Sequence, residues 1–412
     1  MRKLSGLATL ILLAVSGVGS FAGKTSTGKP ETLARAANPK PLSGNVQRGL
    51  AWLAAHQHKN GGWSQGEESA AMSALSDNSQ DIPNVAETSI AALALIRAGS
   101  TPQSGPYAQN VRRAVGFVCS EVEQSDEKSL SVTKLQGTRV QIKLGPFIDT
   151  FMASLLLAEV KGRMPDARSE KRAEAAARKV LDKIARNQKE NGTWDERGWA
   201  PVLSQSMASK ALNRAAQVGQ PVSERARVQA ETYARKQYDR SSGKFGTSGS
   251  AGVALYSAAG NLGAMQQSAN TDIEGEKRAR AKLSTAKTER EREEAQTTLR
   301  RIQANKEDLR SAKGAIARSL QDKQFVSGFG SNGGEEFLSY MNIGESLIVE
   351  GGKEWRQWDT SMTKNLNRIQ NKDGSWTGHH CITGRTFCTA AALLVLTVDR
   401  APLPLAEGIR KR

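Results

Sequence analysis

Two kinds of helical pattern alternate along the chain. One places apolar residues three and four positions apart and ends in a polar turn that contains glycine, which is typical of an amphipathic helix and its stop signal. The other is more uniformly apolar and rich in alanine, which predicts burial on most sides. The apolar segments span residues 86–98, 147–160, 205–216, 250–260, 338–349 and 386–398. The alternation predicts helical hairpins, each with one outer and one inner helix.

A repeated spacing of glutamine and tryptophan marks these hairpins. Three full copies occur: Gln57 with Trp63, Gln188 with Trp194, and Gln370 with Trp376. Weaker copies complete six units, which open near residues 46, 111, 176, 226, 311 and 359. A glutamine after a helix can hydrogen-bond open backbone groups, and a tryptophan can pack over the turn. We therefore predict that these residues hold the repeat together rather than form a reactive site.

The segment from Arg48 to Trp63 reads Arg-Gly-x-x-Trp-Leu-x-x-x-Gln-x-x-x-Gly-x-Trp. It resembles the repeat of squalene and oxidosqualene cyclases and of protein prenyltransferase β subunits. The resemblance covers roughly residues 45–400 and implies an all-α fold, an α/α toroid of six helical hairpins. It also implies inner helices that line a central cavity, in which an isoprenoid or another apolar ligand would bind.

The catalytic motifs of that family are missing from this sequence. Cyclases that begin by protonation need Asp-x-Asp-Asp, because neighbouring carboxylates keep one carboxyl protonated, and diphosphate-dependent synthases need Asp-Asp-x-x-Asp for magnesium. The nearest counterpart of the prenyltransferase zinc motif Asp-x-Cys is Glu335-Glu336-Phe337, and Cys388 stands where the family has histidine. Cyclase and prenyltransferase chemistry is therefore predicted to be absent. Whether the chain catalyses anything is left open. If it is an enzyme, analogy with the fold points to a transferase-like, cyclase-like or lyase-like toroid enzyme that lacks these known motifs.

The last unit concentrates the residues best suited to chemistry: His379, His380, Cys381 and Cys388. Three interpretations are open from the sequence. The four could bind zinc, or Cys388 could be a catalytic thiol; Cys381 and Cys388 could form a disulfide; or all could be structural. Zinc is the one cofactor that these residues suggest. Arg385, at a predicted helix N-terminus, suits an anionic group of a ligand, with His379 and His380 beside it.

Several carboxylates could serve as acid and base at the mouth of the toroid. Asp149 begins a predicted inner helix, and Asp195 follows the second full tryptophan. Carboxylates at such positions more often cap helices or pair with cations. The same ambiguity applies to Glu87, Glu335, Glu336 and Asp359.

Residues 272–313 interrupt the repeat with a charged segment that holds 12 Lys plus Arg and 9 Asp plus Glu. Apolar residues at heptad spacing predict an antiparallel helical hairpin with a coiled-coil seam. One long solvated helix, or disorder, is the alternative. Such an arm could bind a partner protein or an anionic polymer, although a charge run is most often a solvated face.

The ends of the chain and its charge bear on location and partners. Arg2 and Lys3, an apolar run, and small residues at Ser20 and Ala22 predict a signal peptide over residues 1–22. The protein is therefore expected to be exported, to the periplasm, to the cell envelope or out of the cell. A flexible linker is predicted over 23–44 and a basic tail over 401–412. The net charge of +17 favours acidic partners, and export argues against nucleic acid.

Three functions follow as hypotheses. The chain could bind an apolar ligand in a toroid cavity, act as a non-catalytic scaffold for a protein or an anionic polymer, or process a polysaccharide with carboxylates at one rim. Aromatic residues are only 5% of the chain. Cyclases line their cavities with aromatic rings that stabilise cations. The low aromatic content therefore weakens the hypothesis that this chain catalyses cyclisation.

Overall fold

The computed structural model describes residues 39–67, 80–328 and 332–405. Contacts divide the chain into residues 1–30 and 31–412, and every described residue belongs to the second unit. The predicted signal peptide, most of the predicted linker and residues 406–412 lie outside the described residues.

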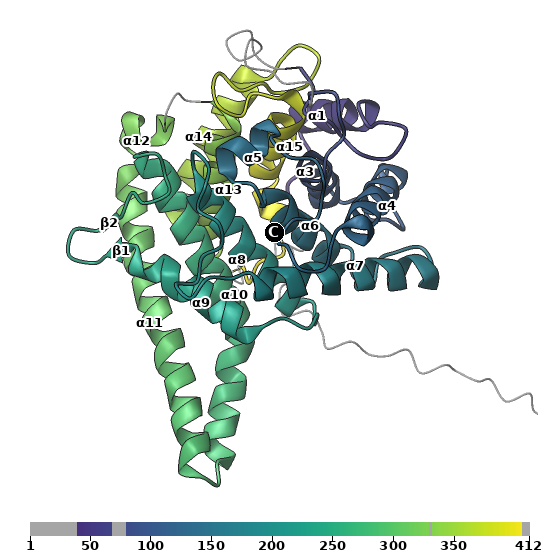
Figure 1. Ribbon diagram of the computed structural model, residues 1–412. Helices are drawn as coiled ribbons and strands as arrows, with labels where there is room; N and C mark the ends of the chain where they lie inside the picture. The colour runs from purple at the N-terminus through teal and green to yellow at the C-terminus, as the bar shows by residue number, and fades with distance from the viewer. Residues whose placement is uncertain (1–38, 68–79, 329–331, 406–412) are drawn as a thin grey trace, which may run out of the picture. The chain divides into compact units, whose positions relative to one another are not determined.

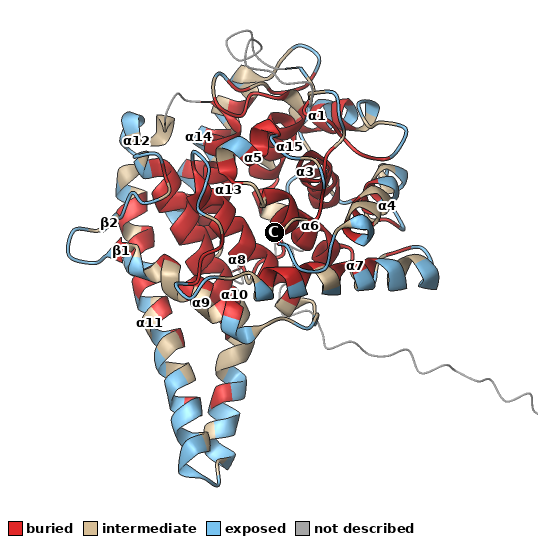
Figure 2. Cartoon of the chain, in the orientation of Figure 1, coloured by how far each residue is buried: buried red, intermediate tan, exposed pale blue. Residues whose placement is uncertain are grey.

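Amphipathic outer helices alternate with more deeply buried inner helices (Figure 2). The outer helices are α1 (Gly44–Ala55), α4 (Ala108–Gln124), α7 (Ala167–Arg186), α9 (Glu224–Lys236), α11 (Glu289–Ser319) and α14 (Gly352–Ile369). The inner helices are α3 (Val85–Arg97), α6 (Ile148–Glu159), α8 (Pro201–Gln217), α10 (Ala254–Thr285), α13 (Gly334–Ile348) and α15 (Arg385–Leu396). Short helices α5 (Arg139–Leu144) and α12 (Lys323–Ser327), the 3-10 turn η1 (Val398–Arg400), and the paired strands β1 (Tyr238–Asp239) and β2 (Lys244–Phe245) join them.

The inner helices form a closed ring (Figure 1). Each contacts the next in the order α3, α6, α8, α10, α13 and α15, and α15 contacts α3. Every residue of α3, α6 and α13 is buried, whereas α7 buries one stripe that includes Ala173, Ala177, Val180 and Ile184. This difference follows the predicted patterns, since a helix inside a ring has neighbours on all sides. The predicted fold class, an all-α α/α toroid, is confirmed.

The three full glutamine and tryptophan motifs make matching contacts. Indole Nε1 donates to a carbonyl oxygen ten residues earlier in each copy, at 2.8 Å: Trp63 to Leu53, Trp194 to Ile184 and Trp376 to Leu366. Each glutamine Nε2 donates to the following outer helix: Gln57 to Asn110 O, Gln188 to Ala226 O and Gln370 to Asn45 O. Because Asn45 belongs to the first hairpin, the last unit is joined to the first by the same bond that joins consecutive units.

Helix α10 runs without a break from the ring into the charged segment, and α11 returns antiparallel to it (Figure 1). At the root of this hairpin, Asp272 accepts from Arg227 at 2.9 Å and from Arg301 at 2.8 Å. Arg301 also pairs with the buried Glu231 of α9, and burial raises the pKa of Glu231 to about 7. The hairpin is therefore attached to the ring by buried charges rather than by an apolar seam alone.

Residues 401–405 correct the predicted boundary of the basic tail. Ala401, Leu403 and Leu405 are each at most 2% exposed. The segment reads Ala-Pro-Leu-Pro-Leu, and its apolar side chains are buried at one end of the ring, where they leave water. The folded unit therefore extends at least to Leu405.

Candidate functional site

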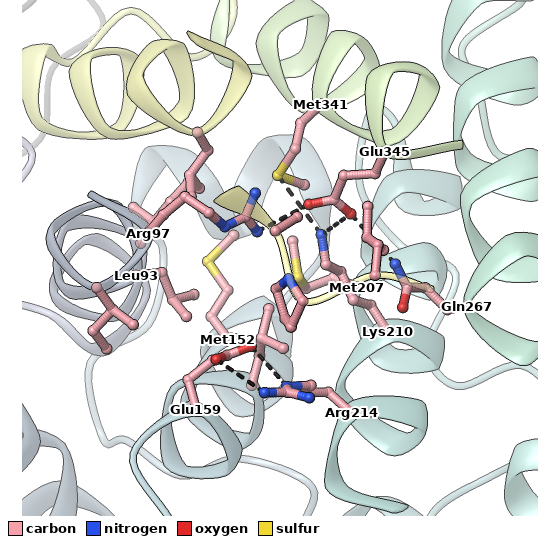
Figure 3. Close-up of a pocket in the computed structure, with 17 residues that line it drawn as sticks. Leu93, Arg97, Met152, Glu159, Met207, Lys210, Arg214, Gln267, Met341 and Glu345 are labelled. Carbon is pink, nitrogen blue, oxygen red and sulfur yellow. Dashed lines mark hydrogen bonds and ion pairs between the residues drawn. The ribbon is translucent and has the colours of Figure 1, made fainter. Parts of the chain in front are cut away.

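Side chains from all six inner helices surround a small, mostly apolar chamber in the ring (Figure 3). Leu93, Met152, Met207 and Met341 line its walls, and the segment 401–403 forms a further wall. The cavity that remains is about 30 Å³, which is room for no more than a few water molecules. Pockets for small molecules are typically about 300–1,000 Å³, so an isoprenoid does not fit in this state.

Buried charges join helices across the ring at the level of this chamber. Glu345 of α13 accepts from Arg97 Nη2 of α3 at 2.9 Å and from Lys210 Nζ of α8 at 2.5 Å (Figure 3). In the ring, α15 lies between α3 and α13, and α10 lies between α8 and α13. Glu345 therefore joins helices that are not neighbours, which closes the centre of the ring.

The electrostatics of this cluster favour an ionised carboxylate. Burial alone would raise the pKa of Glu345, but Lys210 and Arg97 more than offset it and hold that pKa below its usual range. Burial lowers the pKa of Lys210 against the attraction of Glu345. Arg97 is the last residue of α3, where the helix dipole favours a cation. A second buried pair, Arg214 Nε to Glu159 Oε1 at 2.8 Å, lies in the same chamber.

A second group of buried acids lies at the N-terminal ends of the inner helices. Glu335 and Glu336, in the first turn of α13, are fully buried. Glu336 accepts from Tyr256 Oη, and Glu335 Oε2 accepts from Ile382 N at 3.3 Å. Burial and the neighbouring Glu336 raise the pKa of Glu335 to about 8, so Glu335 is mostly protonated at neutral pH.

The histidine and cysteine residues of the last unit do not converge on one point. His379 is exposed, whereas His380 is half-buried with Nε2 3.8 Å from Glu336 Oε1. Cys381 and Cys388 are separate, buried free thiols. Across the described ranges, no three His, Cys, Asp or Glu side chains are grouped as metal ligands would be. The described geometry therefore does not fit the zinc interpretation, and the two thiols are not joined as the disulfide interpretation would have them.

Burial also disfavours a reactive thiolate in this unit. It raises the pKa of Cys381 to about 12, with Glu335 adding to the shift, and it raises the pKa of Cys388 well above the usual value. Cys388 Sγ donates to Ile382 O at 3.3 Å. A nucleophilic cysteine needs a lowered pKa, so Cys388 has the environment of a small core residue.

Arg385, which was predicted to bind an anionic group of a ligand, pairs with two carboxylates of this chain. Its Nη1 lies 2.6 Å from Asp373 Oδ2, and its Nη2 lies 3.0 Å from Glu67 Oε2. A ligand anion would have to compete with both of these groups. Of the two histidines predicted beside it, His379 is exposed and His380 is half-buried near Glu336.

The predicted acid and base, Asp149 and Asp195, occupy different environments. Asp149 Oδ1 accepts from Ala86 N at 2.9 Å, which ties α6 to the start of α3. Burial raises the pKa of Asp149 to about 6. Asp195 pairs with Arg197 at 2.7 Å, and that contact lowers its pKa. The two carboxylates share no bonding partner among the described residues.

Sequence reasoning missed the charges at the centre of the ring. Arg97, Glu159, Lys210, Arg214 and Glu345 each lie in or beside a segment that is predicted to be buried. A charge in such a segment needs a partner, because an isolated buried charge is very costly. That rule could have singled out these five residues, although it could not have paired them.

We expect Glu335→Gln to change how stability depends on pH. The pKa of Glu335 is about 8 in the folded chain and about 4.3 when unfolded. The folded state therefore keeps a proton that the unfolded state releases, and stability falls as pH rises through this window, by up to about 1.4 kcal/mol per pH unit. Urea unfolding at several pH values in this window should show that the free energy of unfolding falls less steeply with pH in the variant than in the parent. Equal slopes for the two proteins would contradict a protonated Glu335.

The fold and its interior define this chain as an α/α toroid with a closed centre. No protein-family model matches the chain, and no curated protein sequence matches it. Among solved structures, it is similar to the apo type II terpene cyclase MstE from Scytonema, at 13% identity and a TM-score of 0.49. The match covers 86% of this chain and 97% of that chain. Similarity at this level says nothing about activity.

Within the described ranges, no helix has both the length and the apolar character needed to cross a bilayer.

Proposed function

We propose that this protein is an exported, non-catalytic interaction scaffold that binds an acidic partner on its basic outer surface. The observation that carries the proposal is the closure of the ring by Glu345, Arg97 and Lys210, which leaves about 30 Å³. Both cations of this cluster bond to the carboxylate of Glu345, and a buried ion cluster can fix the arrangement of the helices that it joins. The net charge of +17 favours an acidic partner.

Ligand binding in the central chamber has less support. A ligand would have to displace the buried segment 401–405 and break contacts across the ring. Polysaccharide processing has less support as well, because glycosidases use two carboxyl groups that flank one bond. Asp149 is buried in a helix junction, and Asp195 is paired with Arg197.

Native mass spectrometry of the chain purified from its own cell envelope tests this proposal. We expect the mass of the protein without a lipid, and we expect squalene and farnesyl diphosphate to be recovered unchanged after incubation. As a matched variant, Arg97→Met/Lys210→Met/Glu345→Met replaces the buried charges with side chains of similar length. It should keep the fold and partner binding, because apolar replacement of a complete ion cluster is often tolerated. A stoichiometric lipid, or a product from either compound, would refute the proposal.

A further inference from the structure

A groove separates the outer helices α11 and α14. It consists of two adjoining hollows of about 480 and 540 Å³. Residues that line both hollows are Ala317, Gln321, Glu354 and Gln357. Each hollow is more than ten times the volume of the central cavity, so the room for a partner lies outside the ring.

The floor of the groove is apolar and carries one unsatisfied donor. Leu320, Val326, Trp358 and Met362 line the first hollow. Trp358 is 4% exposed, and its Nε1 has no hydrogen-bond partner in the described part of the chain. In each full repeat motif, by contrast, the tryptophan donates to a carbonyl oxygen. This N–H is closed off from solvent, so a partner would contact the carbon atoms of the floor rather than this donor.

The rim of the groove carries a surplus of positive charge. Five cations line the two hollows, against the carboxylates of Glu350 and Glu354; the cations are Arg310, Lys313, Arg318, Lys353 and Arg356. Lys313 pairs with Glu350 at 2.8 Å. The other four cations are exposed, and none forms an ion pair with a described residue. Their charge is available to a partner of opposite sign.

We propose that this groove binds an acidic segment of a partner protein. Carboxylates of the segment would face the four exposed cations, and an apolar side chain would enter the floor. The apolar floor favours a protein over an anionic polysaccharide, which has no apolar side chains to bury. Trp358 is also too deeply buried to stack on a sugar ring. The proposal rests on the scaffold function and assigns its binding surface.

Fluorescence anisotropy with a defined probe tests the groove. The probe is a labelled, capped peptide in which Leu recurs at helical spacing among Glu residues, and a matched peptide has Gln in place of every Glu. We expect saturable binding of the Glu peptide, weakened about tenfold by Arg318→Glu/Lys353→Glu/Arg356→Glu. Leu320→Ser removes a half-buried apolar side chain from the floor and should weaken binding about fivefold. The charge-matched control Arg278→Glu/Lys287→Glu/Arg300→Glu, on the hairpin, should bind as the parent does.

Each other outcome overturns the groove as the binding surface. These outcomes are no saturable binding, equal binding of the Gln peptide, no loss in the groove variants, or binding of a heparin fragment alone. If only the hairpin variant lost peptide binding, the binding surface would be the hairpin, and the scaffold function would still be supported. A lipid retained in the ring would instead refute the scaffold function, whatever the peptide does.

Discussion

Replacing Glu345 with alanine is expected to lower the free energy of unfolding by about 3–5 kcal/mol. The substitution removes the carboxylate that Arg97 and Lys210 share and leaves two cations buried, with their side chains each 9% exposed. Desolvation of these charges is then no longer offset by an opposite charge. Urea unfolding, followed by far-UV circular dichroism, measures the change, provided that the denaturant slope stays constant.

Two comparisons separate this effect from a general loss of charge. Glu123 pairs with Arg172 at 2.7 Å, but both side chains are more than 40% exposed, so Glu123→Ala should cost at most about 1 kcal/mol. Arg97→Met/Lys210→Met/Glu345→Met removes the whole cluster and should be far less destabilising than Glu345→Ala. If Glu345→Ala costs less than about 1 kcal/mol, the two cations must reach water, and the centre of the ring is open rather than closed.

Trp376→Ala is the second large expected effect, at about 3–5 kcal/mol. Trp376 is fully buried at the junction between the last hairpin and the first. A Cβ atom added to Gly49 of α1 would lie 2.7 Å from its ring, so the indole packs directly on that helix. The truncation leaves a cavity and removes the donor to Leu366 O. The melting temperature should therefore fall by several degrees or more.

Trp199 provides the matched control, because it is 38% exposed and lies outside the repeat motif. Trp199→Ala should change stability by only about 0.5 kcal/mol. Trp376→Phe should lower stability by an amount between those of the two alanine variants, since it keeps most of the packing and loses the hydrogen bond. Equal, small effects of the two alanine variants would mean that the ring does not depend on this junction.

Local pattern accounts for most of the architecture. Apolar periodicity predicts both the helices and the side each one buries, because the spacing of residues on a helix depends only on the backbone. The repeated glutamine and tryptophan frame predicts the hairpins. The sequence did not show that the first arm of the charged hairpin continues the inner helix α10, which runs unbroken through Gly275.

The candidate sites depended on much longer-range information. His379, His380, Cys381 and Cys388 are close in sequence, yet they differ in burial and form no group of metal ligands across the described ranges. The charges that meet at the centre come instead from three separate hairpins.

The sequence by itself determined an all-α repeat of outer and inner helices, because burial pattern and turn residues act within each hairpin. Only the tertiary structure decided that the ring closes at its centre, that Ala401, Leu403 and Leu405 are buried, and that a basic groove lies between α11 and α14. These features depend on how far each helix is rotated and shifted against helices that are distant in the chain. Side-chain packing across the ring sets those rotations and shifts, and no periodicity along one helix encodes them.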